Sequence, residues 1–251
     1  MKKTRFEFVK EHWQQGLSYL LNGKAFQRIR GKNLSPLEYA CVLRQAYHQY
    51  KEHPQALARL TSKLSGPARG AIKQILAHAL YEVNHEDFAL RDMRSLGLNV
   101  EWCRQTNPLP MTRAILGFMN GLIDGPVPVS ILGYFFHFEM LPSEMGKDIV
   151  QLLGESGIDP NSHSFFFERS HSDEAVRQKL IENCLGEIVE NQEQLDEIAL
   201  AAKASAILHS QLLDEAIDPK RNQIWGLPMG PNDFLETKSP DSIIPFLISS
   251  Y

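Results

Sequence analysis

Glu82 and His85 are spaced so that a helix brings a carboxylate and an imidazole together, about one turn apart. Residues 75–88 contain no Gly or Pro, so we expect them to form the middle of a long helix, with His78, Glu82, His85 and Ala89 on one face. Helical bundles build iron sites from Glu-x-x-His pairs of this kind. The alternative is a solvated helix face on which Glu and His only bond to each other.

Glu139 is the only acidic residue in residues 127–141, the most apolar stretch of the chain. A buried carboxylate is costly unless it is paired, hydrogen-bonded or bound to a metal. Glu139 is therefore a candidate metal ligand on a second helix. Two alternatives are an acid that reaches solvent at the helix edge and an acid that pairs with Arg44. His137 points to a different side of this helix, and we interpret it as structural.

Glu168 and His171 repeat the Glu-x-x-His spacing, directly after three phenylalanines that could form the apolar wall of a small-molecule pocket. The alternative is a first helical turn whose acids complement the helix dipole. Two such pairs and one Glu in an apolar helix make up the ligand set of a non-haem iron bundle. We therefore predict metal ligands at Glu82, His85, Glu139, Glu168 and His171.

Tyr47 and His48 lie shortly before Pro54, where we expect a helix to break. They are candidates for the wall of a pocket, as are His78 and Phe135, and a structural role is the alternative for Tyr47 and His48. The chain has neither a Gly-x-Gly-x-x-Gly element nor a Gly-x-x-x-x-Gly-Lys loop, which argues against nucleotide chemistry. Its three isolated cysteines predict neither a disulfide framework nor a thiolate zinc site.

Every long patterned segment has a helical period, and none alternates as a strand does. Ser35, Pro36 and Glu38 form a helix start signal with a capping box. We expect helices over residues 4–22, 37–60, 66–96, 112–123, 129–153, 164–185 and 192–217, the second kinked or restarted at Pro54 and the fifth broken or bent at Pro142. The sequence thus predicts an all-α protein, a single compact bundle of about seven helices.

Two parts of the chain differ in composition. Residues 1–217 are expected to hold the helical domain. Residues 218–251 are rich in prolines and turn residues yet still apolar, which favours an irregular tail that packs on the domain or on a partner subunit.

The composition is that of an ordinary globular protein, with 43% hydrophobic and 22% charged residues. A net charge of −4 and a pI near 6.1, without a basic run, argue against a nucleic-acid partner. No apolar stretch approaches the length of a membrane span, and the N-terminus lacks the apolar core of a signal peptide. We therefore expect a cytoplasmic protein without a membrane partner.

In the order of its motifs the chain resembles the haem-oxygenase-like fold, in the branch that holds thiaminase II, the pyrroloquinoline quinone synthase, the CADD-like proteins and the iron-containing redox enzymes. The resemblance covers residues 5–217 and rests on residues 47–54, 82–97 and 132–142. Iron-dependent members carry Glu and His on one helix, a Glu in a Gly-Tyr…Glu…Pro helix, and His-x3-Asp-x2-His on a later helix.

Glu82, His85 and Glu139 match the first two of these elements residue by residue. The third departs from the pattern: set on Glu168 and His171, it has Ser in place of the first His and Glu in place of Asp. Set on Asp173 instead, it loses both histidines. We prefer the first alignment because it keeps two potential ligands, and the resemblance then implies one or two iron ions.

The resemblance implies a non-haem iron-dependent oxidase or oxygenase that acts on a small organic molecule in the bundle core, with dioxygen as co-substrate. A homodimer is one assembly that we consider. The alternative is a metal-free protein on the same scaffold with a degenerate metal site. It would be a small-molecule binding or interaction module, or an enzyme of the thiaminase or quinone-synthase kind. Thiaminase II needs a nucleophilic cysteine in its pocket, and Cys41, Cys103 and Cys184 stand in no matching motif.

Overall fold

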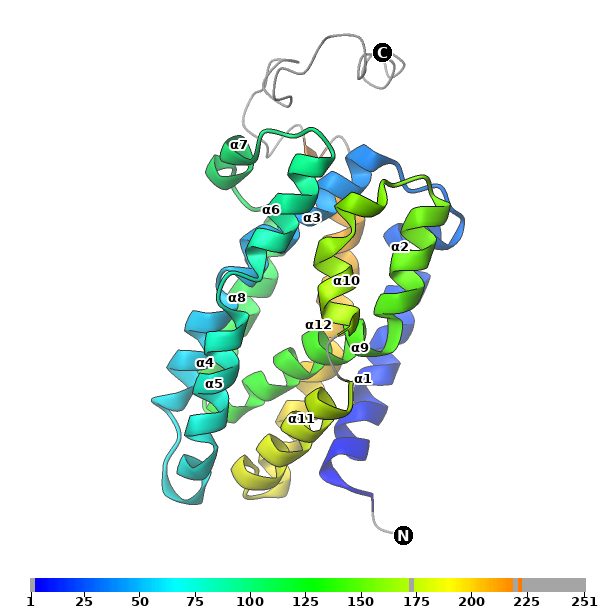
Figure 1. The fold of residues 1–251 in the computed structure, drawn as a ribbon. Helices are drawn as coiled ribbons and strands as arrows, with labels where there is room; N and C mark the ends of the chain where they lie inside the picture. The colour runs from blue at the N-terminus through cyan, green and yellow to red at the C-terminus, as the bar shows by residue number, and fades with distance from the viewer. Residues whose placement is uncertain (1–2, 172–173, 219–220, 223–251) are drawn as a thin grey trace, which may run out of the picture.

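The computed structural model describes residues 3–171, 174–218 and 221–222, and of residues 102, 169–171 and 174–177 it describes the backbone alone. These residues form the all-α bundle that the sequence predicts (Figure 1). The expected tail, residues 218–251, lies almost wholly outside the described residues, so its packing stays a prediction. Among the described helices, none has both the length and the apolar character that crossing a bilayer requires.

Twelve α-helices and three short 3₁₀ helices follow one another in the described residues, because several of the expected helices are each divided by a turn. The α-helices are α1 Arg5–Asn22, α2 Lys24–Arg30, α3 Pro36–Tyr50, α4 His53–Thr61, α5 Ile72–Glu82, α6 Glu86–Ser95, α7 Val100–Gln105, α8 Pro110–Asp124, α9 Ile131–Glu155, α10 Ser164–His171, α11 Glu174–Ile188 and α12 Gln192–Ala216. The 3₁₀ helices are η1 Gly66–Ala71, η2 Pro128–Ser130 and η3 Pro160–Ser162.

Local start signals place several of these helices. Ser35 caps α3 and forms the expected capping box with Glu38, whose side chain accepts a hydrogen bond from the Ser35 amide at 2.8 Å. Thr4 and Glu7 form a second capping box at the start of α1. Pro54 occupies the first turn of α4, where a missing amide hydrogen costs nothing, so the helix restarts there.

The expected long helix over residues 66–96 is wrong, because the chain leaves the helix after Glu82. Val83 is extended, with φ −61° and ψ 130°, and Asn84 adopts a left-handed φ of 70°. Asparagine is one of the few residues that tolerate this conformation. A new helix, α6, starts at Glu86. The apolar side expected for this segment is only partly buried: Ile75 and Ala79 lie in the core, whereas Leu80 is 76% exposed.

Helix α9, in contrast, continues where we expected a break or a bend. It continues through Pro142 to Glu155, so the chain is not broken there. A proline inside a helix removes one backbone hydrogen bond and costs about 3 kcal/mol. Residues 133–142 are all buried, and packing of this apolar segment offsets that cost.

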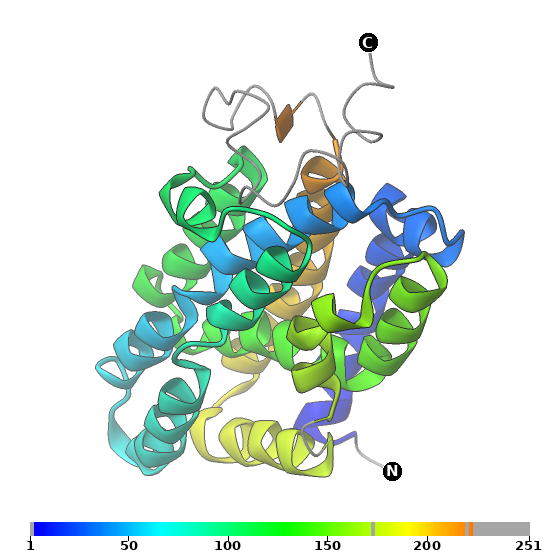
Figure 2. The ribbon, with the colours of Figure 1, turned by 45° about the horizontal axis from the view of Figure 1, so that its top comes forward.

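Helix α12 runs through the middle of the bundle, with α1 packed along it and α9 across it (Figure 2). Glycines allow both contacts. A Cβ atom on Gly16 of α1 would lie 2.4 Å from the carbonyl oxygen of Lys203, and one on Gly133 of α9 would lie 2.0 Å from that of Ile198. The backbones therefore approach more closely than any larger residue permits.

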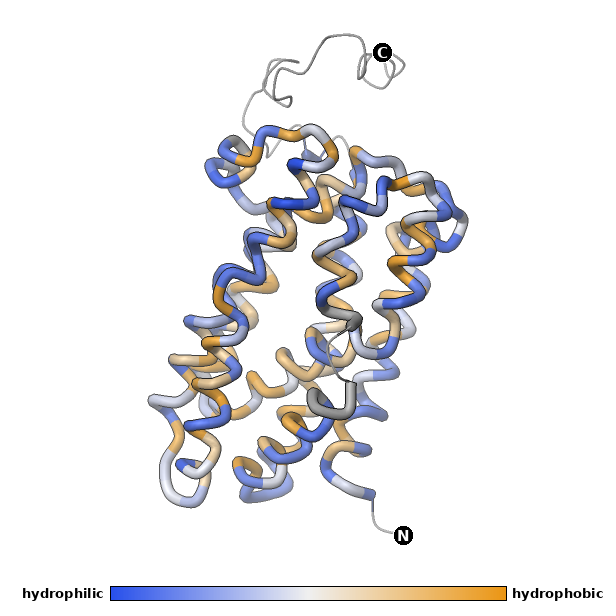
Figure 3. Tube along the Cα trace, in the orientation of Figure 1, coloured by the Kyte–Doolittle hydropathy of each residue, from blue (hydrophilic) through white to orange (hydrophobic). Residues whose placement is uncertain are grey.

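Hydrophobic and hydrophilic positions alternate along the helices with the period of amphipathic packing (Figure 3). The hydrophobic positions form one continuous core, whose largest fully buried side chains include Trp13, Tyr134, Phe136 and Phe138. Three of these four belong to α9. The segment of α9 that carries Glu139 is therefore enclosed in the core.

Candidate metal centre

His78, Glu82 and Glu139 form a cluster in which one ligand atom from each lies within 4.8 Å of the other two. His78 and Glu82 stand one turn apart on α5, and Glu139 faces them from α9. His78 Nε2 lies 3.4 Å from Glu139 Oε1. Glu82 is 2% exposed and Glu139 is 5% exposed, so two carboxylates meet away from solvent.

His85 joins this cluster from outside helix α5. The turn over residues 83–85 places it directly before α6, and its Nδ1 lies 3.0 Å from Glu82 Oε1. Glu82 and His85 therefore meet as predicted, although a turn and not a continuous helix brings them together. His53, at the start of α4, approaches the second oxygen of the same carboxylate, with Nδ1 3.9 Å from Glu82 Oε2.

The donor set of this cluster fits a divalent transition metal. Two carboxylates buried within 4.8 Å of each other repel, and both lose their hydration. A cation bound between them compensates for the repulsion and for the lost hydration. Imidazole nitrogen and carboxylate oxygen together are ligands of non-haem iron. The three side chains come from two rigid helices, which can hold such a donor set in place. His78, Glu82 and Glu139 thus satisfy the chemical requirement for iron.

The structure does not bring the third predicted element into this cluster. Glu168 is exposed on α10, and the side chain of His171 lies outside the described residues. Ser164, where the family pattern has its first His, donates its hydroxyl hydrogen to the carboxylate of Asp92. Asp92 also accepts the amide hydrogens of Ser164 and Phe165 at 2.9 and 2.8 Å, so it caps α10. Within the described side chains this segment contributes no metal ligand.

The other predicted pocket residues lie in different surroundings. His48 is 1% exposed and hydrogen-bonded through Nε2 to Thr106 Oγ1 at 3.0 Å, and burial lowers its pKa to about 3. Tyr47 is half-buried, with the Lys51 ammonium group over its ring. Phe135 is buried against His53. None of these three residues lines the apolar cavity between α3, α9 and α12.

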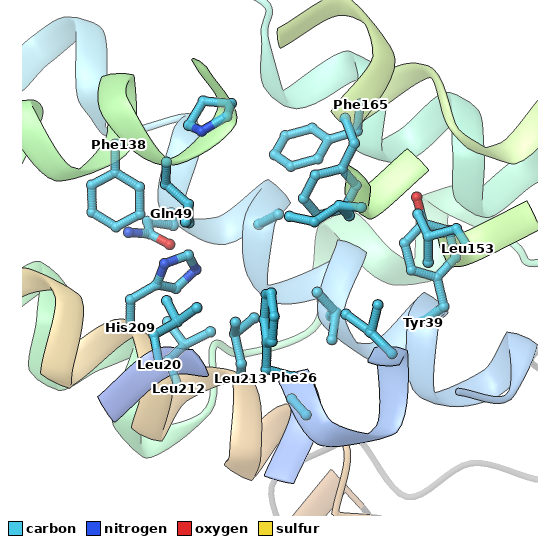
Figure 4. A pocket seen from close by; sticks show the side chains of 18 of the residues that line it. Leu20, Phe26, Tyr39, Gln49, Phe138, Leu153, Phe165, His209, Leu212 and Leu213 are labelled. Carbon is cyan, nitrogen blue, oxygen red and sulfur yellow. The ribbon is translucent and has the colours of Figure 1, made fainter. Parts of the chain in front are cut away.

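An apolar cavity of about 70 Å³ opens between α1, α2, α3, α9, α10 and α12 (Figure 4). Its wall includes the side chains of Phe26, Tyr39, Phe138, Leu153, Phe165 and Leu212. The amide side chain of Gln49 and the imidazole of His209 also reach it. Phe165 comes from the phenylalanine run at residues 165–167, for which the sequence predicts a pocket wall.

His53 lies between this cavity and the carboxylate cluster. Its ring packs on Tyr50 and Phe138, with centroids 4.6 and 5.5 Å apart, and both of these residues line the cavity. Its Nε2 lies 3.0 Å from the hydroxyl of Tyr134, which accepts a further hydrogen bond from Gln49. The metal cluster and the cavity are therefore separated by a single side chain.

Sequence reasoning missed His53 and His209, although the helical register contains a signal for each. His53 stands four residues before the buried Leu57, and so belongs to the packed stripe of α4. His209 stands four residues after the buried Ser205 and three before Leu212, on the packed face of α12. A histidine in an apolar stripe is a candidate for an interior role.

Comparison with known proteins places the chain in a family. Residues 41–209 match the model of a family described as iron-containing redox enzymes. None of the curated proteins matches the chain significantly.

Solved structures share its fold at low sequence identity. A domain of unknown function with a haem oxygenase-like fold from Shewanella denitrificans OS217 is 22% identical, with a TM-score of 0.74 over 88% of this chain and 93% of that one. A TenA homologue from P. horikoshii OT3 is 12% identical, with a TM-score of 0.70 over 86% and 99% of the two chains. Haem oxygenase-1 from Synechocystis sp. PCC6803, in complex with haem, is 11% identical, with a TM-score of 0.69 over 88% and 96%.

These neighbours agree on the haem-oxygenase-like fold, and the family match covers well over half of the chain. The resemblance seen in the order of the motifs is thereby confirmed. The chain belongs to the family of iron-containing redox enzymes.

Proposed function

We propose that this protein is a non-haem iron-dependent oxidase or oxygenase that acts on a small organic molecule in the bundle core. The observation that carries the proposal is the convergence of His78, Glu82 and Glu139 from two helices on one buried point. The family match supports the choice of iron. The apolar cavity supports a small-molecule substrate, because its wall lies one side chain away from the cluster.

His78, Glu82 and Glu139 would hold the iron, and His85 is close enough to Glu82 to complete or orient the set. Iron bound here would supply dioxygen binding and electron transfer, which protein side chains do not provide. The two carboxylates supply the negative charge that balances the cation. Burial of both keeps bulk water from competing for the site.

The surrounding side chains position the cluster. Nδ1 of His85 lies 3.0 Å from Oε1 of Glu82, which as a carboxylate oxygen accepts, and this contact fixes the orientation of that carboxylate. His53 presents Nδ1 toward Glu82 and Nε2 toward the Tyr134 hydroxyl. Its ring can hold a proton on either nitrogen, at a point between the cluster and the cavity. Phe138 and Tyr50 exclude water on the cavity side.

One observation favours a metal-free binding protein instead. Each carboxylate of the cluster lies beside an imidazole, Glu139 beside His78 and Glu82 beside His85. Such contacts can satisfy a buried carboxylate without any cation. In this second candidate function the cavity would bind a small molecule, and the cluster would be a hydrogen-bonded part of the core.

Iron analysis of a Glu139→Gln variant separates the two. Gln keeps the shape of Glu but is a weaker ligand, so the affinity for Fe(II) should fall at least about tenfold. Glu168→Gln is the matched control, because Glu168 is exposed and lies outside the cluster. We expect it to bind iron like the parent. Oxygen consumption by the iron-loaded protein should follow the iron content.

Thermal unfolding in the presence of a chelator adds an independent reading. Without metal, Glu139→Gln removes one of two neighbouring buried charges, so the melting temperature should stay level or rise. In Fe(II) the parent and Glu168→Gln should gain more stability than Glu139→Gln, because a ligand that binds the folded state more tightly stabilises it more. No iron above background in the supplemented parent protein would refute the proposal and favour the metal-free candidate.

A further inference from the structure

Among the residues that the structure describes, the wall of the cavity between α1, α2, α3, α9, α10 and α12 contains no Lys, Arg, Asp or Glu side chain. Its polar side chains are largely engaged. Tyr39 donates to the carbonyl oxygen of Ser162 at 2.9 Å, and Gln49, which is 1% exposed, donates to Tyr134 at 2.8 Å. The ring of His209 is half-buried and points into the cavity beside Phe138 (Figure 4).

His209 is the last member of a hydrogen-bonded chain that crosses three helices. Trp13 Nε1 of α1 lies 2.9 Å from Nδ1 of His137 on α9. Nε2 of His137 lies 2.9 Å from Nδ1 of His209 on α12. Within the described part of the chain, Nε2 of His209 makes no hydrogen bond, and this nitrogen is left for an occupant of the cavity.

The chemistry of tryptophan sets the direction of this chain. An indole nitrogen can only donate, so Nδ1 of His137 must accept. A neutral His137 then carries its proton on Nε2 and donates to Nδ1 of His209. A neutral His209 must in turn carry its proton on Nε2, the nitrogen open to the cavity. Three helices thereby present the His209 N–H donor in a mainly apolar wall.

Both imidazoles are held neutral by their surroundings. Nδ1 of His137 accepts from Trp13 and Nδ1 of His209 accepts from His137, so neither ring can take a second proton while these hydrogen bonds are kept. Burial lowers the pKa of His209 to about 3, with a smaller contribution from His53. A charged occupant would therefore lose its hydration and find no opposite charge in the wall.

We propose that this cavity binds an uncharged, mainly apolar molecule through a single hydrogen-bond acceptor of the carbonyl type, which receives the Nε2 hydrogen of His209. At roughly 10–15 Å³ for each water-sized group, a cavity of about 70 Å³ takes a molecule of about six non-hydrogen atoms without rearrangement. The binding inference is independent of iron. Only the identification of this molecule as a model of the substrate rests on the proposed function.

Nitrogen NMR of the full chain labelled with ¹⁵N-histidine tests the direction of the chain, because protonated and unprotonated ring nitrogens have well-separated chemical shifts. We expect His209 and His137 to carry their protons on Nε2 at neutral pH. Trp13→Phe should release this preference in both rings, while the parent spectrum remains interpretable if that variant folds poorly. A His209 proton on Nδ1 in the parent protein would overturn the proposal.

Binding is tested with three probes of six non-hydrogen atoms. Cyclopentanone and methylenecyclopentane share a shape and differ only in the acceptor, while isobutyrate carries a charge. A single neutral hydrogen bond corresponds to about a three- to tenfold difference in Kd, so cyclopentanone should bind that much more tightly than methylenecyclopentane. Isobutyrate should bind more weakly than both. The affinities are read from probe-induced shifts in the same NMR spectra.

His209→Phe keeps a ring of similar size and removes the donor. It should abolish the preference for cyclopentanone and leave the affinity for methylenecyclopentane within about twofold. Retention of the preference in this variant, tighter binding of isobutyrate, or no binding of either cyclic probe would overturn the proposal. The iron content of each sample is measured alongside, so a failure of the iron proposal remains distinguishable from a failure of this one.

Discussion

Acidification should destabilise the fold through His48, because the folded chain cannot accommodate its imidazolium form. Thr106 Oγ1 donates to the carbonyl oxygen of Cys103 at 2.8 Å, so it receives the Nε2 hydrogen of His48. Nδ1 of His48 is therefore unprotonated, and it is buried without a hydrogen-bond partner among the described residues. Protonation would place a second N–H donor where no acceptor is available.

The size of the effect follows from proton linkage. Burial, assisted by the positive charges of Lys51, Arg44 and Arg113, lowers the pKa of His48 from 6.5 to about 3. Below pH 6.5 the unfolded chain binds a proton that the folded chain does not. The contribution of His48 to stability is thus complete above pH 6.5 and is lost as pH falls toward about 3. At about 1.4 kcal/mol per pH unit, going from pH 7 to pH 5 costs about 2 kcal/mol.

Urea unfolding of the parent and of His48→Gln at pH 7, 6 and 5 measures this contribution. Gln can still donate to Thr106 but does not titrate, so the loss between pH 7 and 5 should be smaller in the variant by about 2 kcal/mol. Other titrating groups are shared by the two proteins and cancel in the difference. Thr106→Val is the control, because it removes the hydrogen bond and keeps the imidazole. Equal pH slopes in the parent and His48→Gln would refute the reasoning.

Two further predictions concern the helices that position the site. Gly133→Ala should lower the free energy of unfolding by about 3 kcal/mol or more, because its Cβ would meet the α12 backbone and not a movable side chain. The control Gly121→Ala, in α8 with open space around it, should be neutral or stabilise by up to about 1 kcal/mol in urea unfolding. Asp92→Asn should cost about 1–3 kcal/mol, because an amide cannot accept both amide hydrogens at the start of α10. An Asp92→Asn melting temperature equal to that of the parent would contradict this account of the cap.

The all-α fold was predictable because it depends on local patterns that repeat. Helical periodicity and capping boxes act within a few residues of the chain. The capping box predicted for Ser35 and Glu38 is present at the start of α3. The break after Glu82 was not predictable from the same patterns. Asn84 in a left-handed conformation costs little, so the packing of α5 on α4 and of α6 on α3 decides the break, and periodicity carries no information about it.

In the candidate site, the sequence identified those residues whose type or spacing stands out within their own segment. Glu139 is an acid in an apolar helix, and Glu82 and His85 have a helical spacing, so each is visible in a single stretch of sequence. His53 and His209 have no such setting, because their partners lie on other helices. Glu168 has the spacing of a ligand, but its orientation on α10 turns it to solvent. Spacing within one helix does not determine which way the helix faces.

The hydrogen-bonded chain from Trp13 to His209 depends on residues that take no part in it themselves. Its members lie 124 and 72 positions apart, and His137 and His209 meet where α9 and α12 pack together at very short distance. The crossing is at Gly133, whose missing side chain admits the backbone of Ile198 and Ala202. His137 follows Gly133 by about one turn, and His209 follows Ala202 by about two, so the contact fixes both rings. The donor in the cavity thus depends on a glycine, which relates the proposed binding specificity directly to the packing of the bundle.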